Sequence, residues 1–299
     1  MECLVMANAL LMAMKPQSFL ISVMSVSVGV ALAALSHPIH WGDYLLTVLG
    51  VVFLHGGTNV INDYFDYKNK VDTTEVPGSY GNESRVLVQK LLLPSQVFLA
   101  GLILFAFSLG IGIYLTFAKG ITVFVIGALG FLTGFFYSAN PVSFKYIALG
   151  EPAVFLMWGP LMVSGAYYVQ TGGFSLQTFL VSFPFGILVA LVLFANNIRD
   201  IQFDGQVGIR TLAIQMGERR AIKLYQFLIA VVYLWTALMV ITRQLGHWSL
   251  FVLLSIPLAY KLAKGLQRGI PKDADARTAQ LDTAFGALLI IGFILERFL

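Results

Sequence analysis

The chain has 299 residues, of which 58% are hydrophobic and only 11% are charged, and its formal net charge is +4. This composition is too apolar for a soluble globular domain and indicates an integral membrane protein. The chain has no basic patch with interleaved aromatic residues, so we expect no nucleic-acid partner, and its single cysteine excludes an intrachain disulfide.

Nine apolar stretches approach the roughly 20 residues that a helix needs to cross the hydrocarbon core of a bilayer. No hydrophilic block between them is long enough for a separate soluble domain. We therefore predict an all-α integral membrane fold with nine transmembrane helices in a single domain over residues 1–299. The predicted spans are 19–35, 45–61, 97–117, 121–136, 152–169, 179–195, 224–241, 248–262 and 283–294.

The basic residues indicate the orientation of these spans. Nine crossings divide the 19 lysine and arginine residues into 16 on the side of the N-terminus and 3 on the other side. Because basic residues concentrate in cytoplasmic loops, we predict a cytoplasmic N-terminus and an external C-terminus. The cap loops at about 67–93, 137–150 and 197–223 are then cytoplasmic as well.

A cluster of carboxylate and amide side chains, TNVINDYFDYKNKVD at 58–72, closes the second span and is called the first motif below. An ionised carboxylate near bilayer depth costs roughly 2.5–3.5 kcal/mol on insertion scales, so the cluster needs a group that neutralises it. Asn62 and Asp66 are four residues apart and share one helix face. Mg²⁺ binds one or two carboxylates together with water and substrate phosphate, so we predict that Asn62 and Asp66 bind Mg²⁺.

Several polar residues lie around the first motif. His55 precedes Asn59 by one turn, on the helix face that leads to the motif. We predict that His55, Asn59 and Asp63 line a substrate cavity, although a lone buried histidine is more often a packing residue. Lys15, just before Pro16, is either an interfacial anchor or a cation at the mouth of that cavity.

The loop at 137–150 adds hydroxyls at Tyr137 and Ser138 and a cation at Lys145 on the same side of the membrane. These are candidate phosphate-binding groups. Glu151 follows the loop and opens the fifth span. An acid at this position stabilises the positive end of a helix dipole, and the alternative is a place in the substrate cavity.

Two further inner loops differ in their predicted roles. The loop at 67–93 contains turn signals and carries Arg85 near its far end. Arg85 is either a membrane anchor or a group on a lid, where its planar fork would suit phosphate. The mixed charges at 261–277 predict a solvated face.

A second motif, NNIRDIQFD at 196–204, follows the sixth span. Asn196, Asp200 and Asp204 repeat the step of four residues. Two acidic helix ends that face each other are suited to hold two Mg²⁺ around one diphosphate. Asn197 and Arg210 are further candidate diphosphate-binding residues.

Together the two motifs resemble those of the UbiA superfamily of intramembrane prenyltransferases, and the resemblance runs nearly the whole chain. It is strongest to the branch that prenylates 1,4-dihydroxy-2-naphthoate for menaquinone biosynthesis. Gly57, Asn59, Asn62 and Asp66 match the G-x-N-x-x-N-x-x-x-D pattern of that branch. The second motif N-N-x-R-D-x-x-x-D and the following T-L-A run at 211–213 match as well.

One departure concerns the end of the first motif. Ubiquinone-type members carry a third acid four residues after the second. This chain has Lys70 there, and its next acid is Asp72. The departure favours the naphthoate branch and leaves the role of Asp72 open.

The resemblance implies a UbiA-type fold around a central cavity, with Mg²⁺, two ions by this interpretation, as cofactor. It also implies a polyprenyl diphosphate donor, an aromatic acceptor such as 1,4-dihydroxy-2-naphthoate, and contact of the donor tail with membrane lipid. The implied metal-binding residues are Asn62, Asp66, Asn196, Asp200 and Asp204, and all of these except Asn196 are also implied to be catalytic. The implied diphosphate-binding residues are Arg85, Tyr137, Ser138, Lys145, Asn197 and Arg210. The implied acceptor or cavity residues are His55, Asn59, Asp63 and Glu151.

Two alternatives remain open from the sequence. The same enzyme class serves other acceptors, such as a 4-hydroxybenzoate-like acid or a glycerophospholipid-type alcohol. A secondary transporter also carries carboxylates within broken membrane helices. The acids of this chain cluster at one membrane face rather than at the midplane, which favours the enzyme.

Overall fold

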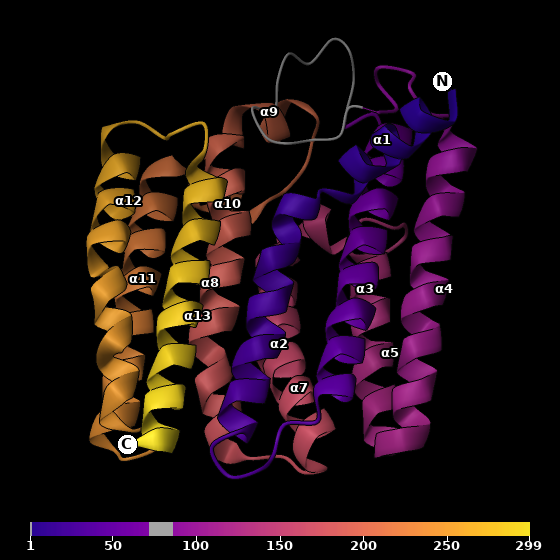
Figure 1. The fold of residues 1–299 in the computed structure, drawn as a ribbon. Coiled ribbons are helices and arrows are strands. Elements are labelled where there is room, and N and C mark those ends of the chain that lie inside the picture. Colours follow the sequence, from indigo (N-terminus) through magenta and orange to yellow (C-terminus); the bar gives the residue numbers. More distant parts are fainter. Residues whose placement is uncertain (1, 72–85) are drawn as a thin grey trace.

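The computed structural model describes residues 2–71 and 86–299. In these residues every secondary-structure element is a helix, and there is no strand. Figure 1 shows the long helices packed side by side. The long helices are α1 (Glu2–Met14), α2 (Phe19–Ala33), α3 (Trp41–Lys68), α4 (Pro94–Lys119), α5 (Ile121–Phe136), α7 (Met162–Thr171), α8 (Leu176–Arg199), α11 (Glu218–Ile241), α12 (Ile256–Arg268) and α13 (Ala274–Phe298). The short ones are η1 (Pro16–Ser18), η2 (Phe144–Ile147), α6 (Gly150–Leu156), η3 (Met157–Leu161), α9 (Ile201–Gln206), α10 (Leu212–Met216) and η4 (His247–Ser255).

Eight helical segments in the described residues are long and apolar enough to cross a membrane, and α5 is a further apolar helix of 16 residues. The predicted all-α membrane fold is confirmed, and the count of nine spans is approximate. The two termini lie at opposite ends of the bundle, as an odd number of crossings requires (Figure 1). The end at which the N-terminus and α9 lie is called the motif end below.

The last two spans are longer than the sequence predicted. They run over His247–Gln267 and Ala274–Phe298 rather than 248–262 and 283–294. Charged residues at their ends lower the local hydropathy, but they do not interrupt the backbone hydrogen bonds of a helix. Hydropathy therefore located these spans and underestimated their length.

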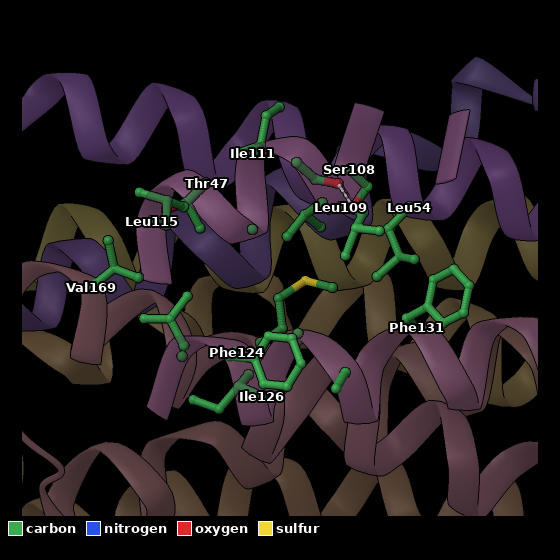
Figure 2. A pocket seen from close by; sticks show the side chains of 18 of the residues that line it. Thr47, Leu54, Ser108, Leu109, Ile111, Leu115, Phe124, Ile126, Phe131 and Val169 are labelled. Atoms are coloured by element: carbon green, nitrogen blue, oxygen red, sulfur yellow. Dashed lines mark hydrogen bonds between the residues drawn. The ribbon is translucent and has the colours of Figure 1, made fainter. Parts of the chain in front are cut away.

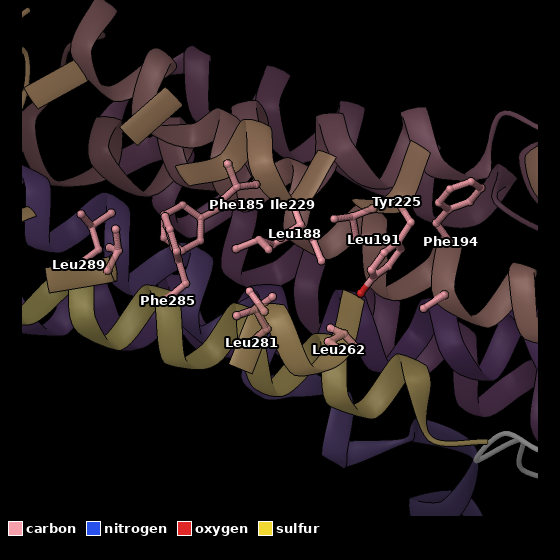
Figure 3. Packing of buried hydrophobic residues seen from close by; sticks show 14 of the residues in the cluster. Phe185, Leu188, Leu191, Phe194, Tyr225, Ile229, Leu262, Leu281, Phe285 and Leu289 are labelled. Carbon is pink, nitrogen blue, oxygen red and sulfur yellow. The ribbon is translucent and has the colours of Figure 1, made fainter. Parts of the chain in front are cut away.

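The C-terminal half of the bundle has a dense core between α8, α11, α12 and α13. Figure 3 shows Phe185, Leu188 and Phe285 interdigitating within it, and all three are fully buried. The hydroxyls of Tyr225 and Thr278 are 2.7 Å apart and join α11 to α13. Packing of this kind drives helix association inside a bilayer. It holds α8, whose motif end carries the second motif, in a fixed position.

The fifth span is interrupted by a π-helical turn, η3, that contains Pro160. Gly159 lies against α8 so closely that a Cβ there would be 2.8 Å from Gly186 Cα and 2.9 Å from the Ser182 carbonyl oxygen. Turns of this type are frequent at functional sites. This one places Trp158 so that its indole Nε1 donates a hydrogen bond to Ser22 on α2 at 2.9 Å.

Candidate active site

The first motif lies at the motif end of α3, where Asp66 is the centre of a buried hydrogen-bond network. Its Oδ2 accepts hydrogen bonds from Asn62 Nδ2 at 2.9 Å and from Lys145 Nζ at 2.7 Å. Its Oδ1 accepts one from the Tyr146 hydroxyl at 2.5 Å. Asn62 Oδ1 accepts a hydrogen bond from the Ser138 hydroxyl. The predicted common face of Asn62 and Asp66 is confirmed, and the loop after α5 covers it.

That loop, residues 137–150, is fixed by backbone hydrogen bonds. The amide of Lys145 donates to the carbonyl of Tyr137 at 2.9 Å, and the amide of Arg210 donates to the carbonyl of Tyr146 at 3.2 Å. The second contact joins the loop to the segment that follows the second motif. Arg210 itself is exposed. The loop therefore bridges the two motifs.

Arg199 organises the second motif at the end of α8, where its side chain is 4% exposed. Its Nε and Nη2 donate to the two carboxylate oxygens of Asp200 at 2.9 and 2.8 Å, and Nη2 also donates to Asn196 Oδ1. Its Nη1 donates to the carbonyl of Lys272 at 3.0 Å and lies 3.2 Å from Asp275 Oδ1. The five N–H groups of the guanidinium therefore all have acceptors.

Two of these acceptors lie at the start of α13, the Lys272 carbonyl just before the helix and Asp275 in its first turn. The sequence predicted only a solvated face for residues 261–277. Lys272 is exposed, in agreement with that prediction, and only its backbone carbonyl contacts Arg199. Asp275 is partly buried because its carboxylate contacts Arg199 beside the second motif.

Asp204 on α9 is influenced by charges from both motifs. Burial raises its pKa from 3.8 to about 6, and the nearby Asp200 and Asp66 act in the same direction. Lys145 and Arg199 oppose this rise in pKa. Asp66 belongs to the first motif and Asp200 to the second, so charges from both acidic helix ends act on Asp204.

Lys145 is the cation at the centre of this site. Burial alone would lower its pKa, but Asp66 together with Tyr146 and Tyr137 holds the pKa well above its usual value. Lys145 is therefore charged at neutral pH. It balances Asp66 directly, while Arg199 balances Asp200.

The donor atoms of the site suit a hard divalent cation. They are carboxylate and amide oxygens from two motifs, which is the chemistry that Mg²⁺ prefers. Among the described residues, no group of three or more His, Cys, Asp or Glu side chains lies close enough together to hold a metal ion. The residues thus fit Mg²⁺ that is bound through few protein ligands and completed by water or phosphate, and they do not form a preformed cage.

A cavity of about 140 Å³ lies beside the first motif, and His55, Asn59, Tyr137 and Trp158 are among its lining residues. Burial raises the pKa of Tyr137, and Glu151, Asp66 and Asp204 add to the rise while Lys145 opposes it. Tyr137 therefore joins this cavity, called the chamber below, to the carboxylates.

His55 is held on the chamber wall by two hydroxyls of the first span. Its Nδ1 is 2.8 Å from Ser22 Oγ and its Nε2 is 3.2 Å from Ser18 Oγ. Asn59 donates to the carbonyl of Met14 at 2.9 Å and to Ser18 Oγ at 3.3 Å. Two of the four predicted cavity residues, His55 and Asn59, thus line the chamber.

The other two predicted cavity residues form pairs elsewhere. Asp63 lies 3.0 Å from Lys15 Nζ, which ties α3 to the start of the first span. Glu151 accepts a hydrogen bond from Asn197 at 2.9 Å, which ties α6 to α8. Neither is among the residues that line the chamber. Arg85 lies outside the described residues, and so does Asp72.

An apolar groove of about 370 Å³ lies beside the chamber, between α3, α4, α5 and α7. Val51, Leu54 and Met162 line both spaces. In Figure 2, Leu54 and Phe131 lie at one end of the groove, with Leu115 and Val169 at the other. The chamber and the apolar groove are therefore neighbours that share part of their lining.

Sequence reasoning missed four residues of this site: Ser18, Ser22, Tyr146 and Trp158. One signal was available. Ser18 and Ser22 are four residues apart, as are His55 and Asn59, so each pair occupies one face of its helix. Nothing in the sequence indicates which residue Trp158 contacts.

Known proteins resemble this chain over most of its length. The model of the UbiA prenyltransferase family matches residues 22–289. The chain is 30% identical to a 1,4-dihydroxy-2-naphthoate octaprenyltransferase of Bacillus subtilis (strain 168), over 95% of this chain and 91% of that protein. It is 29% identical to UbiA prenyltransferase domain-containing protein 1 of Homo sapiens, over 95% of this chain and 82% of that protein.

Solved structures share the fold. A UbiA homolog from Archaeoglobus fulgidus bound to GPP and Mg²⁺ superposes with a TM-score of 0.71 at 16% identity, over 97% of this chain and 100% of that one. A digeranylgeranylglyceryl phosphate synthase superposes with a TM-score of 0.61 at 17% identity, over 98% of each chain.

The raised pKa of Asp204 predicts that its ionised carboxylate lowers the folding stability of the ligand-free protein. The folded-state pKa of about 6 exceeds the unfolded value of 3.8, so Asp204 contributes stability at low pH and this contribution is lost as the pH rises through 6. Asp204→Asn keeps the shape without the charge. We expect it to raise the melting temperature of the ligand-free protein at about pH 8, and to have little effect near pH 4.

Melting curves in detergent with a chelator, taken across this pH range, test the expectation. Asp273→Asn is the control, because a hydrogen bond from Arg277 lowers the pKa of the exposed Asp273. A lower melting temperature for Asp204→Asn at about pH 8 would show that the buried charge is stabilising and would contradict this account.

Proposed function

This chain belongs to the UbiA prenyltransferase family and is a multi-pass membrane prenyltransferase; we propose that its donor is a polyprenyl diphosphate and its acceptor 1,4-dihydroxy-2-naphthoate, in menaquinone biosynthesis. The observation that carries the proposal is the meeting of two acidic motifs beside Lys145, next to a chamber and an apolar groove. The Bacillus subtilis relative, whose name states this acceptor, supports the choice.

We assign Asn62 and Asp66 on one side, and Asp200 and Asp204 on the other, to Mg²⁺ binding, with two ions around one diphosphate. Asn196 is the weakest candidate, because its Oδ1 already accepts a hydrogen bond from Arg199. Two Archaeoglobus fulgidus homolog structures that hold Mg²⁺ with GPP or DMAPP support this cofactor. When bound, Mg²⁺ supplies positive charge that stabilises the leaving diphosphate.

We assign the neighbouring hydrogen-bond donors to balancing the negative charge of the diphosphate that Mg²⁺ leaves uncompensated. Lys145 moves from Asp66 to a phosphate oxygen, and the hydroxyls of Tyr137 and Ser138 lie on the same loop. Arg210 is exposed beside that loop, which suits it to meet an incoming phosphate. Asn197 is engaged with Glu151 and serves the site by joining helices. Arg85 remains a prediction.

The chamber is where the reacting carbons meet in this proposal. The C–O bond of the donor breaks with its electron pair on the diphosphate, and the allylic cation is attacked by the electron-rich acceptor ring. The carboxylate of the naphthoate leaves as carbon dioxide, as the resemblance implies. Trp158 and Tyr137 line the chamber, and we assign them the role of excluding water, which would otherwise capture the cation.

The polar wall of the chamber suits the acceptor. His55 and Asn59 present ring and amide groups there, and their serine partners hold them in place. Asp63 and Glu151 support this wall from outside through Lys15 and Asn197. We assign the apolar side, at Val51 and Leu54, to the first part of the prenyl tail. The tail then follows the groove toward the lipid.

The site lies at the motif end, which we propose is cytoplasmic. The excess of basic residues on that side supports this orientation. It gives a soluble aromatic acid access from the cytoplasm, while the prenyl tail reaches the groove from the membrane.

The direct test is an acceptor panel with purified protein, farnesyl or geranylgeranyl diphosphate and Mg²⁺, read by mass spectrometry. We expect a prenylated, decarboxylated naphthoate. Asp66→Asn and Asp200→Asn should each reduce turnover by about a thousandfold or more, because each removes a carboxylate proposed to hold the Mg²⁺ that binds the diphosphate. Asp273→Asn, which changes an exposed acid outside the site, should retain full turnover.

Three results would change this proposal in different ways. Transfer only to 4-hydroxybenzoate or to a glycerophosphate alcohol would replace naphthoate as the proposed acceptor, and the enzyme class would stay the same. Diphosphate release that does not depend on Mg²⁺ would contradict the cofactor. No release with any acceptor, together with solute uptake in liposomes, would favour the transporter.

The groove gives a second test, on the length of the donor tail. Gly112 lines the groove on α4, and a Cβ at this position would meet nothing within 4 Å. Gly112→Leu therefore adds an apolar side chain at the lining of the groove, with room for its Cβ. We expect kcat/KM for geranylgeranyl diphosphate to fall by about tenfold or more, because lost apolar burial of this size has that effect. The value for dimethylallyl diphosphate, which ends before the groove, should change little.

Gly110→Leu is the matched control. Gly110 is two residues away on the same helix, a Cβ there also meets nothing within 4 Å, and it does not line the groove. An equal loss for long and short donors in Gly112→Leu, or the same profile in both variants, would show that the tail lies elsewhere.

A further inference from the structure

Arg199 connects the second motif to the start of the last helix. Its guanidinium donates hydrogen bonds to both carboxylate oxygens of Asp200 and to Asn196, so it fixes two side chains of that motif at once. The opposite edge of the same guanidinium is held by the carbonyl of Lys272 and by Asp275. An Arg199 side chain that is 4% exposed has little room to adopt another geometry.

We infer that Asp275 is a positioning residue for the proposed diphosphate site and acts on Asp200 through Arg199. This inference rests on the proposed function. Asp275 is outside both motifs, and its side chain is 24% exposed, so it does not belong to the buried carboxylate cluster itself. Its influence reaches that cluster only through Arg199.

The charges explain why a second carboxylate is useful here. Arg199 carries one positive charge and contacts two carboxylates, Asp200 and Asp275. One net negative charge therefore remains on this group of three residues. If Asp275 were neutral, Arg199 would neutralise Asp200 completely. Asp200 would then attract a divalent cation more weakly.

A simpler role for Asp275 is stabilisation of α13. It lies in the first turn of that helix, where an acid interacts favourably with the helix dipole. Its Oδ1 also accepts a hydrogen bond from the amide of Ala276 at 2.9 Å. This role predicts a change in melting temperature alone. The positioning role predicts a change in the Mg²⁺ concentration that the protein requires, so the two roles are separable.

The experiment uses the full chain in detergent and measures melting temperature during a Mg²⁺ titration with geranyl S-thiolodiphosphate, a donor analogue that does not react. For Asp275→Asn, we expect the Mg²⁺ concentration for half-maximal stabilisation to rise by about tenfold, as it would for loss of one favourable charge contact. Turnover assays should show the same shift in Mg²⁺ requirement, with kcat at saturating Mg²⁺ changed less. Asp275→Glu should restore most of the response.

Asp273→Asn is the matched control, since Asp273 is at the start of the same helix and pairs with Arg277. If Asp275→Asn lowers the ligand-free melting temperature and leaves the Mg²⁺ midpoint as in Asp273→Asn, the inference is overturned and Asp275 is only a helix-end residue. If the wild-type protein shows no Mg²⁺-dependent stabilisation by the analogue, the proposed function fails and this inference falls with it.

Discussion

Burial of Asp66 and Asp200 at the ends of membrane helices, with the half-buried Asp204 on α9, is the constraint on which this structure depends. Asp66, Asp200 and Asp204 come from two distant parts of the chain, and each would be costly near the bilayer without a cation. Lys145 and Arg199 balance two of them, and the raised pKa of Asp204 shows that the third is incompletely balanced. Surplus negative charge of this kind suits a divalent cation, as the proposed function requires.

The two halves of the bundle serve this site in different ways. The core of α8, α11, α12 and α13 is densely packed and fixes the second motif. Around α3, α4, α5 and α7 the packing is open enough to leave the groove. The π-helical turn lies between these regions and directs Trp158 to the chamber. A densely packed polar end beside an open apolar groove is the arrangement that the proposed polyprenyl diphosphate donor requires.

Local patterns in the sequence predicted the membrane fold and part of the site. The step of four residues from Asn62 to Asp66 was sufficient because a helix fixes that geometry by itself. The pairing of Lys145 with Asp66 joins residues 79 positions apart, and no local rule gives it. The contact of Arg199 with Asp275 was missed for the same reason. Mixed charge in a loop is typical of a solvated face, and only the packing of α13 against α8 shows otherwise.

The central claim is that the two motifs hold metal ions together with the diphosphate. The most direct measurement replaces Mg²⁺ with Mn²⁺ and counts bound ions by electron paramagnetic resonance, with and without geranyl S-thiolodiphosphate. The account predicts two ions per chain, with spectra broadened by mutual coupling, and predicts them only when the analogue is present, because the described residues form no preformed cage. One isolated ion, or the same occupancy without the analogue, would contradict it.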